Sequence, residues 1–153
     1  MIVLSRTVRS AAFCRRVSSA NSLEWRVDIA PEADRIKVNK ELLLLVLDNL
    51  VDNAIKFTEV AGYVAVSAVR EDSQIRIRVA DNGCGIPDLE QDRVFERFYR
   101  GPETAPTRGS GIGLSLVKNI AQAHGGRAWA KNAAGGGAVV GFSIPVAGGV
   151  AAA

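Results

Sequence analysis

The chain has 153 residues, of which 48% are hydrophobic and 23% are charged, and its net charge is +3 at pH 7. This length and composition predict one domain with a hydrophobic core, and the mixed charges give no indication of nucleic-acid binding. The longest apolar run, residues 42–47, is far shorter than the roughly 20 residues that span a bilayer. The two cysteines, Cys14 and Cys84, form no metal-binding pattern, so we expect free thiols in a reduced compartment.

Residues 1–20 contain four arginines and no acidic residue. This composition resembles a mitochondrial presequence, and it also fits the end of a truncated helix. We therefore expect residues 1–20 to be a basic N-terminal segment, either a linker or the end of a truncated helix, that stands apart from a domain spanning residues 21–147. The small, low-complexity residues 148–153 predict a disordered tail.

The hydrophobic periodicity of residues 24–144 predicts several strands and two helices. An alternation of period two, or a short apolar run, predicts strands at 24–29, 35–38, 63–69, 74–79, 127–131 and 138–144. Asn39 is expected to cap a helix that ends near Thr58, and a second helix is expected at 113–123, ended by Gly125 and Gly126. Strands and long helices do not alternate regularly, which argues against a doubly wound parallel sheet.

The first helix has one polar face in addition to its broad apolar face. Asn49, Asn53 and Lys56 are spaced by four and three residues, so their side chains lie together on that face. One interpretation is a solvated surface. The other is a site for a metal ion and an anion, because amide oxygens suit Mg²⁺ and a lysine suits phosphate.

Asp81 follows an alternating strand and precedes Gly83 and Gly85. A carboxylate at this place can accept a hydrogen bond from an exocyclic amine, and the glycines allow a close approach of the backbone. Taken alone, the segment is better explained as an ordinary Asp-Asn-Gly turn, which is a common motif.

Gly109, Gly111 and Gly113 precede the second predicted helix. Such a segment can bind phosphate through backbone N–H groups at the positive helix end, although helix-opening glycines are common. The GxxxxGK[ST] motif of a P-loop is absent, and no strand-GxGxxG-helix unit indicates a Rossmann site.

The connection between Pro87 and Gly109 is long and polar, which is typical of a functional or mobile segment. It contains an aromatic cluster that either tethers the loop or closes over a ligand. The cluster and its flanking cations are Phe95, Phe98, Tyr99, Arg97 and Arg100.

In their order along the chain and in their spacing, the four segments (the first helix, residues 81–87, the aromatic cluster and residues 109–114) resemble the N, G1, F and G2 boxes of sensor histidine kinases. The resemblance is to their catalytic ATP-binding domain, in the GHKL ATPase superfamily, and it covers residues 21–147. It implies an α+β two-layer sandwich with a mixed, mostly antiparallel sheet and helices on one face. Because the motifs are of a bacterial type, we favour the truncated helix over the presequence for residues 1–20.

The resemblance also implies roles for individual residues. Asp81 would bind the adenine amino group beside Gly83, Gly85 and Ile86, and Asn53 would coordinate Mg²⁺. The expected phosphate cradle is formed by Gly109, Gly111, Gly113 and Leu114. Phe95 and Phe98 would pack an ATP lid that is mobile without nucleotide. The expected contacts of the transferred phosphate are Asn49, Lys56, Arg97 and Arg100, with Arg108 as a further candidate.

The implied activity is transfer of the γ-phosphate of Mg-ATP to a histidine on a dimerisation domain in two-component signalling. That domain would lie in a longer protein or act in trans, with a response regulator as an indirect partner, because the single histidine, His124, is expected to be structural. Hydrolytic relatives carry a glutamate where this chain has Asn49, so ATP hydrolysis ranks third. The alternatives are a non-catalytic ATP-binding module or an anti-sigma-type serine kinase. We expect a cytoplasmic location, with any membrane anchor in a longer parent protein.

Overall fold

The computed structural model describes residues 2–9, 23–58, 62–86, 91, 93–96, 113–133 and 136–146. Its main sheet has five strands in the order β2-β4-β5-β7-β6, and a second sheet pairs β1 with β3. The strands are β1 (Ile2–Val3), β2 (Glu24–Ile29), β3 (Arg35–Ile36), β4 (Tyr63–Glu71), β5 (Gln74–Asp81), β6 (Ala128–Asn132) and β7 (Ala138–Pro145). The helices are α1 (Leu4–Val8), α3 (Lys40–Phe57) and α4 (Gly113–Ala123), with short 3-10 turns η1 (Pro31–Ala33) and η3 (Arg93–Phe95).

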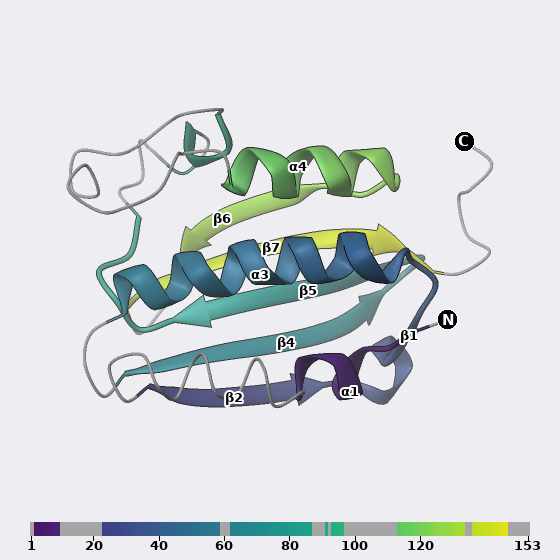
Figure 1. The fold of residues 1–153 in the computed structure, drawn as a ribbon, viewed down its shortest axis with the longest axis horizontal. Helices are drawn as coiled ribbons and strands as arrows, with labels where there is room; N and C mark the ends of the chain where they lie inside the picture. The colour runs from purple at the N-terminus through teal and green to yellow at the C-terminus, as the bar shows by residue number, and fades with distance from the viewer. Residues whose placement is uncertain are drawn as a thin grey trace.

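The main sheet is mixed and largely antiparallel. β2 pairs with β4 in parallel, whereas the pairs β4–β5, β5–β7 and β6–β7 are all antiparallel. Helices α3 and α4 lie side by side on one face of the sheet (Figure 1). The predicted two-layer α+β sandwich is therefore confirmed.

Helix α3 begins as its sequence predicts. The Asn39 side chain accepts a hydrogen bond from the Leu42 N–H at 3.1 Å, which satisfies one of the donors left free at a helix start. On the apolar face of α3, Leu43, Val46, Leu47, Leu50, Val51 and Ala54 are buried, and Leu44 and Ile55 are partly buried. Helix α3 packs this face against both the sheet and α4.

Strand β5 alternates between a buried and a partly exposed face along its whole length. Its buried positions are Ile75, Ile77, Val79 and Asp81. The carboxylate of Asp81 thus stands at the end of an apolar row, on the same face of the sheet as the helices. Side chains alternate strictly across a strand, so the register of β5 decides this placement.

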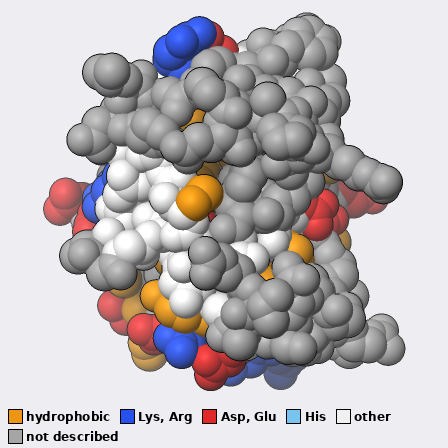
Figure 2. Space-filling model, turned by 90° about the vertical axis from the view of Figure 1, so that its left-hand side faces the viewer, with side chains coloured by type: hydrophobic (Ala, Val, Ile, Leu, Met, Phe, Trp, Pro, Cys, Tyr) orange, Lys and Arg blue, Asp and Glu red, His pale blue; other side chains and the backbone are white. Residues whose placement is uncertain are grey.

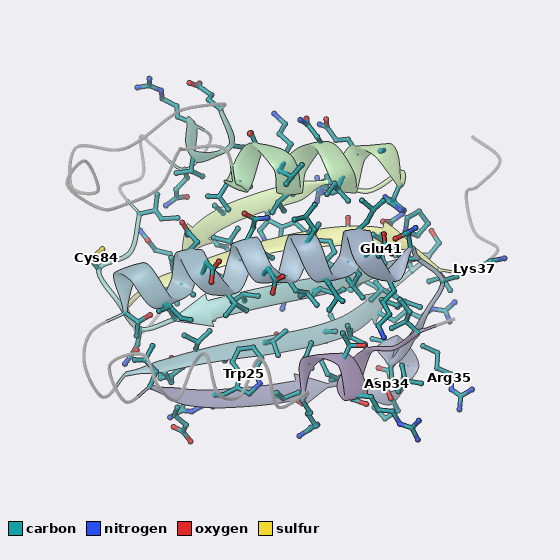
Figure 3. The ribbon with its side chains drawn as sticks, in the orientation of Figure 1. Trp25, Asp34, Arg35, Lys37, Glu41 and Cys84 are labelled. Carbon is teal, nitrogen blue, oxygen red and sulfur yellow. The ribbon has the colours of Figure 1, made fainter. Side chains whose placement is uncertain are left out.

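The N-terminal residues 2–9 pack against the domain, contrary to the expectation that residues 1–20 stand apart. Leu4 and Val8 are buried in the core. Asp34, shown beside α1 in Figure 3, accepts hydrogen bonds from the N–H and the Oγ of Ser5 at 2.7 and 3.0 Å. Trp25 donates from Nε1 to the Val8 carbonyl at 2.9 Å. Apolar residues among the arginines therefore join this segment to the fold, and the boundary at residue 21 is not a boundary of the core.

Candidate functional site

The segments predicted to bind nucleotide converge on one edge of the molecule. The C-terminal ends of α3, β5 and β6 and the N-terminal end of α4 all lie at the left-hand side of Figure 1. Cys84 marks the loop that follows β5 at this edge (Figure 3). Much of the described surface here is backbone and uncharged polar side chains, as Figure 2 shows.

Asp81 is held in a buried position by backbone groups. Only 5% of the surface of this residue is exposed, and Oδ1 accepts hydrogen bonds from the N–H groups of Gly83 at 2.9 Å and Ala138 at 3.4 Å. Burial raises the pKa of Asp81 above its usual 3.8, while the two hydrogen bonds oppose this shift. No described residue donates to Oδ2, so one carboxylate oxygen stays available for a ligand.

The loop after β5 is fixed by a residue that the sequence analysis did not single out. The Asn132 side chain accepts from the Ile86 N–H at 2.6 Å and donates to the Ile86 carbonyl at 2.8 Å. A Cβ atom on Gly137 would lie only 1.9 Å from the Asp81 carbonyl oxygen. The glycine run at 135–137 was the available sequence signal, since a close backbone approach requires glycine.

Helix α3 meets the start of α4 at Asn49. A Cβ atom on Gly113 would lie 2.8 Å from Asn49 Oδ1, closer than real Cβ atoms approach a neighbour. Asn49 also donates from Nδ2 to the Leu45 carbonyl at 2.8 Å, which directs its oxygen toward α4. The polar face of α3 and the glycine that opens α4 are thus in contact.

Asn53 lies one helical turn beyond Asn49 on α3 and is half-buried. No described residue forms a hydrogen bond with its amide, so this oxygen is free to coordinate an ion. The described residues contain no group of three or more His, Cys, Asp or Glu that could hold a metal on its own. A Mg²⁺ ion here would therefore take its remaining ligands from water and phosphate, which is its usual mode of binding.

The connection between β5 and α4 is anchored at Phe95. This residue is buried in the core, and η3 contacts α4. Ile86 and Leu114 are partly buried against the same core. The remaining predicted contacts lie outside the described residues: Arg97, Phe98, Arg100, Arg108, Gly109, Gly111 and the side chain of Lys56.

The buried charge of Asp81 predicts a stability that depends on pH. Because the pKa of Asp81 is higher in the folded chain than in the unfolded chain, the folded chain binds this proton more tightly. The contribution of Asp81 to the free energy of unfolding therefore falls as the pH rises from about 3.8 through the raised pKa. Asp81→Asn removes the charge and keeps an oxygen for the two N–H donors. We expect a gain on the order of 1 kcal/mol at pH 7 without nucleotide.

Urea unfolding of both proteins between pH 4 and pH 8 measures this effect. The difference between them should shrink toward acid pH, as Asp81 of the folded chain becomes protonated. A variant that is less stable than the unmutated chain at pH 7 would contradict the assigned cost of the buried charge.

Comparison with known proteins identifies the family. Residues 38–148 match the model of the histidine kinase-, DNA gyrase B- and HSP90-like ATPases. The chain belongs to this family. The family is one of ATPases, so membership supports ATP as a ligand of this chain.

Individual relatives are sensor kinases. The adaptive-response sensory kinase SasA of Prochlorococcus marinus is 36% identical over 82% of this chain, which spans 34% of that kinase. Full-length ShkA in complex with AMPPNP has a TM-score of 0.77 at 31% identity, covering 94% of this chain and 29% of ShkA. The histidine kinase ThkA in complex with the response regulator TrrA has a TM-score of 0.74 at 26% identity, covering 94% and 39%.

The chain thus corresponds to about a third of the sensor kinases it resembles. Among the described residues, no helix combines the length and the apolar character needed to cross a membrane. His124 donates a hydrogen bond from Nδ1 to the Ile120 carbonyl at 2.9 Å. This contact with the last turn of α4 supports a structural role for the single histidine.

Proposed function

We propose that this chain binds Mg-ATP and donates the γ-phosphate to a histidine on a partner dimerisation domain in two-component signalling. The observation that carries the proposal is the convergence at one edge of a buried carboxylate, an amide-bearing helix face and a glycine that opens a helix. Asp81, Asn49 and Gly113 represent these three features. Together they offer one contact for a base and several for a triphosphate.

The adenine end of the site would be Asp81. Its Oδ1 is occupied by the backbone N–H groups of Gly83 and Ala138. Its Oδ2 would accept a hydrogen bond from the exocyclic amine of adenine. ShkA was crystallised with the ATP analogue AMPPNP, which supports the same ligand class for this chain.

The phosphate end would be the contact between α3 and α4. The backbone N–H groups and the helix dipole at the start of a helix such as α4 favour an anion there. The residue that would hold Mg²⁺ is Asn53, whose amide makes no hydrogen bond with a described residue. The ion, when bound, would neutralise charge on the phosphates. Lys56 and the arginines of the 97–108 segment remain proposed phosphate contacts.

Transfer to a protein is favoured over hydrolysis by the identity of residue 49. An amide cannot take a proton from water, and the Asn49 amide nitrogen is already bonded to the Leu45 carbonyl. The acceptor would be a histidine on a dimerisation domain, in a longer protein or in trans. The complex of ThkA with the response regulator TrrA supports a response regulator as the next partner.

Replacing Asn53 with alanine should remove the dependence of ATP binding on Mg²⁺. The amide oxygen is the proposed protein ligand, so its loss should cancel an advantage of roughly tenfold or more in ATP affinity, about 1.4 kcal/mol. Calorimetric titration with ATP, in Mg²⁺ and in EDTA, measures this difference. Asn119→Ala, an amide deletion on the exposed side of α4, is the matched control. If Asn53→Ala kept its Mg²⁺ dependence, the metal assignment would be wrong.

A further inference from the structure

We infer that Asn132, at the end of β6, is a positioning residue that gives the nucleotide site its preference for adenine; this inference rests on the proposed function. The side-chain amide of Asn132 forms two hydrogen bonds with the backbone of one residue, Ile86. Oδ1 accepts from the Ile86 N–H at 2.6 Å, and Nδ2 donates to the Ile86 carbonyl at 2.8 Å. We call this pair of bonds the Asn132–Ile86 clamp.

The clamp fixes both the position and the orientation of the backbone at Ile86. Two parallel bonds from a planar amide restrain rotation as well as distance, which one bond does not. The Ile86 carbonyl also accepts a bond from Gln91 Nε2 at 3.4 Å. Ile86, which ends the 81–86 segment, therefore forms hydrogen bonds both with Asn132 of the sheet and with Gln91 of the connection that follows it.

The Asn132–Ile86 clamp also requires a glycine at position 85. The φ of Gly85 is +78°, a conformation that favours glycine. A Cβ atom there would also lie 2.8 Å from Asn132 Oδ1, so a side chain would displace the amide. The glycine assigned to the nucleotide by resemblance is thus already required by the clamp without any nucleotide.

The β6–β7 hairpin holds the other end of the segment through Asp81. The Ala138 N–H donates to Asp81 Oδ1 at 3.4 Å, and the Gly137 backbone lies against the Asp81 carbonyl. Within the hairpin, the Ala133 N–H donates to the Gly137 carbonyl at 2.9 Å. The hairpin therefore restrains the 81–86 segment at both ends, and with it the direction of the free Oδ2 atom.

A base-selective contact needs this restraint. Selectivity for adenine requires Oδ2 and the surrounding backbone to stay in place when a base without the amine is offered, so that the mismatch is not relieved by movement. Asn132 itself does not touch the proposed ligand atom. Because Asn132 is exposed, its truncation leaves the Ile86 groups accessible to water and creates no buried cavity, so the fold is expected to persist.

The test compares Asn132→Ala with the unmutated chain and with the control Asn119→Ala. In the nucleotide-free protein, the exchange rate of the Ile86 amide hydrogen should rise about tenfold in Asn132→Ala only. Calorimetry should show ATP affinity weakened about tenfold and the ratio of ATP to GTP affinity reduced. The thermal midpoint should stay close to that of the unmutated chain.

Two further variants separate positioning from a general structural effect. Asn132→Asp keeps an acceptor for the Ile86 N–H but places an oxygen against the Ile86 carbonyl, so selectivity should fall while part of the amide protection remains. In the background of Asp81→Asn, adding Asn132→Ala should cost less ATP affinity than it does alone, because both changes act on one contact.

The inference would be overturned if Asn132→Ala left the ratio of ATP to GTP affinity unchanged, as it would if both affinities fell equally. Full additivity of Asn132→Ala with Asp81→Asn would also overturn it. Absence of ATP binding by the unmutated chain would instead refute the proposed function, and the inference with it. The exchange of the Ile86 amide reports on the clamp in either case.

Discussion

Incubated with γ-labelled ATP, the chain alone should stay unlabelled, while an added helical dimerisation domain with a phosphoacceptor histidine should become labelled. The label should be acid-labile and base-stable, as expected for phosphohistidine. The reason is geometric, because in-line transfer requires reacting atoms about 3 to 3.5 Å apart. His124 follows the last residue of the 11-residue helix α4. At 1.5 Å per residue, about 16 Å separates it from the helix start where the phosphates would lie.

The contact of the single histidine restrains its ring. Its Nδ1 donates a hydrogen bond to the Ile120 carbonyl at 2.9 Å, which holds the imidazole against the C-terminal end of α4, away from the helix start. The control is His124→Ala, which should label the partner as the unmutated chain does. Strong label on the chain alone that survives His124→Ala would point to a serine kinase. ATP binding without any labelled partner would favour the non-catalytic alternative.

ATP should bind more tightly than GTP, and Asp81→Asn should remove most of this preference. Adenine offers an amine to the carboxylate, whereas guanine presents a carbonyl oxygen at the same position. Leaving a buried polar group unpaired costs about 1–3 kcal/mol, which corresponds to roughly a tenfold to hundredfold difference in affinity. Competition between the two nucleotides, followed by calorimetry, measures the ratio.

Two features make this experiment specific. Asp28→Asn removes the same charge from an exposed position on β2 and should leave the ratio unchanged. Asp81→Asn is also expected to be more stable than the unmutated chain without nucleotide, so weaker ATP binding cannot be attributed to unfolding. Equal affinities for ATP and GTP in the unmutated chain would show that Asp81 does not select the base.

Features that depend on neighbouring residues could be predicted from the sequence. The cap of α3 at Asn39, the helix at 113–123 and strand β2 at 24–29 occur where periodicity and capping placed them. The order of the four motifs also indicated the family that the comparison confirmed. Each of these features rests on short-range preferences, which the sequence contains directly.

Contacts between distant segments were decided by the tertiary structure. Periodicity placed Asp81 after a strand, but only the packing of helices over β5 shows that its carboxylate is buried and its pKa raised. The clamp joins residues 46 positions apart, and nothing local in either segment indicates the partner. The same holds for Ser5. The basic composition of residues 1–20 indicated a segment apart from the domain, but Ser5 donates two hydrogen bonds to Asp34 of the domain. A sequence pattern reports which face of an element is apolar, whereas the meeting of two polar groups depends on how the elements pack.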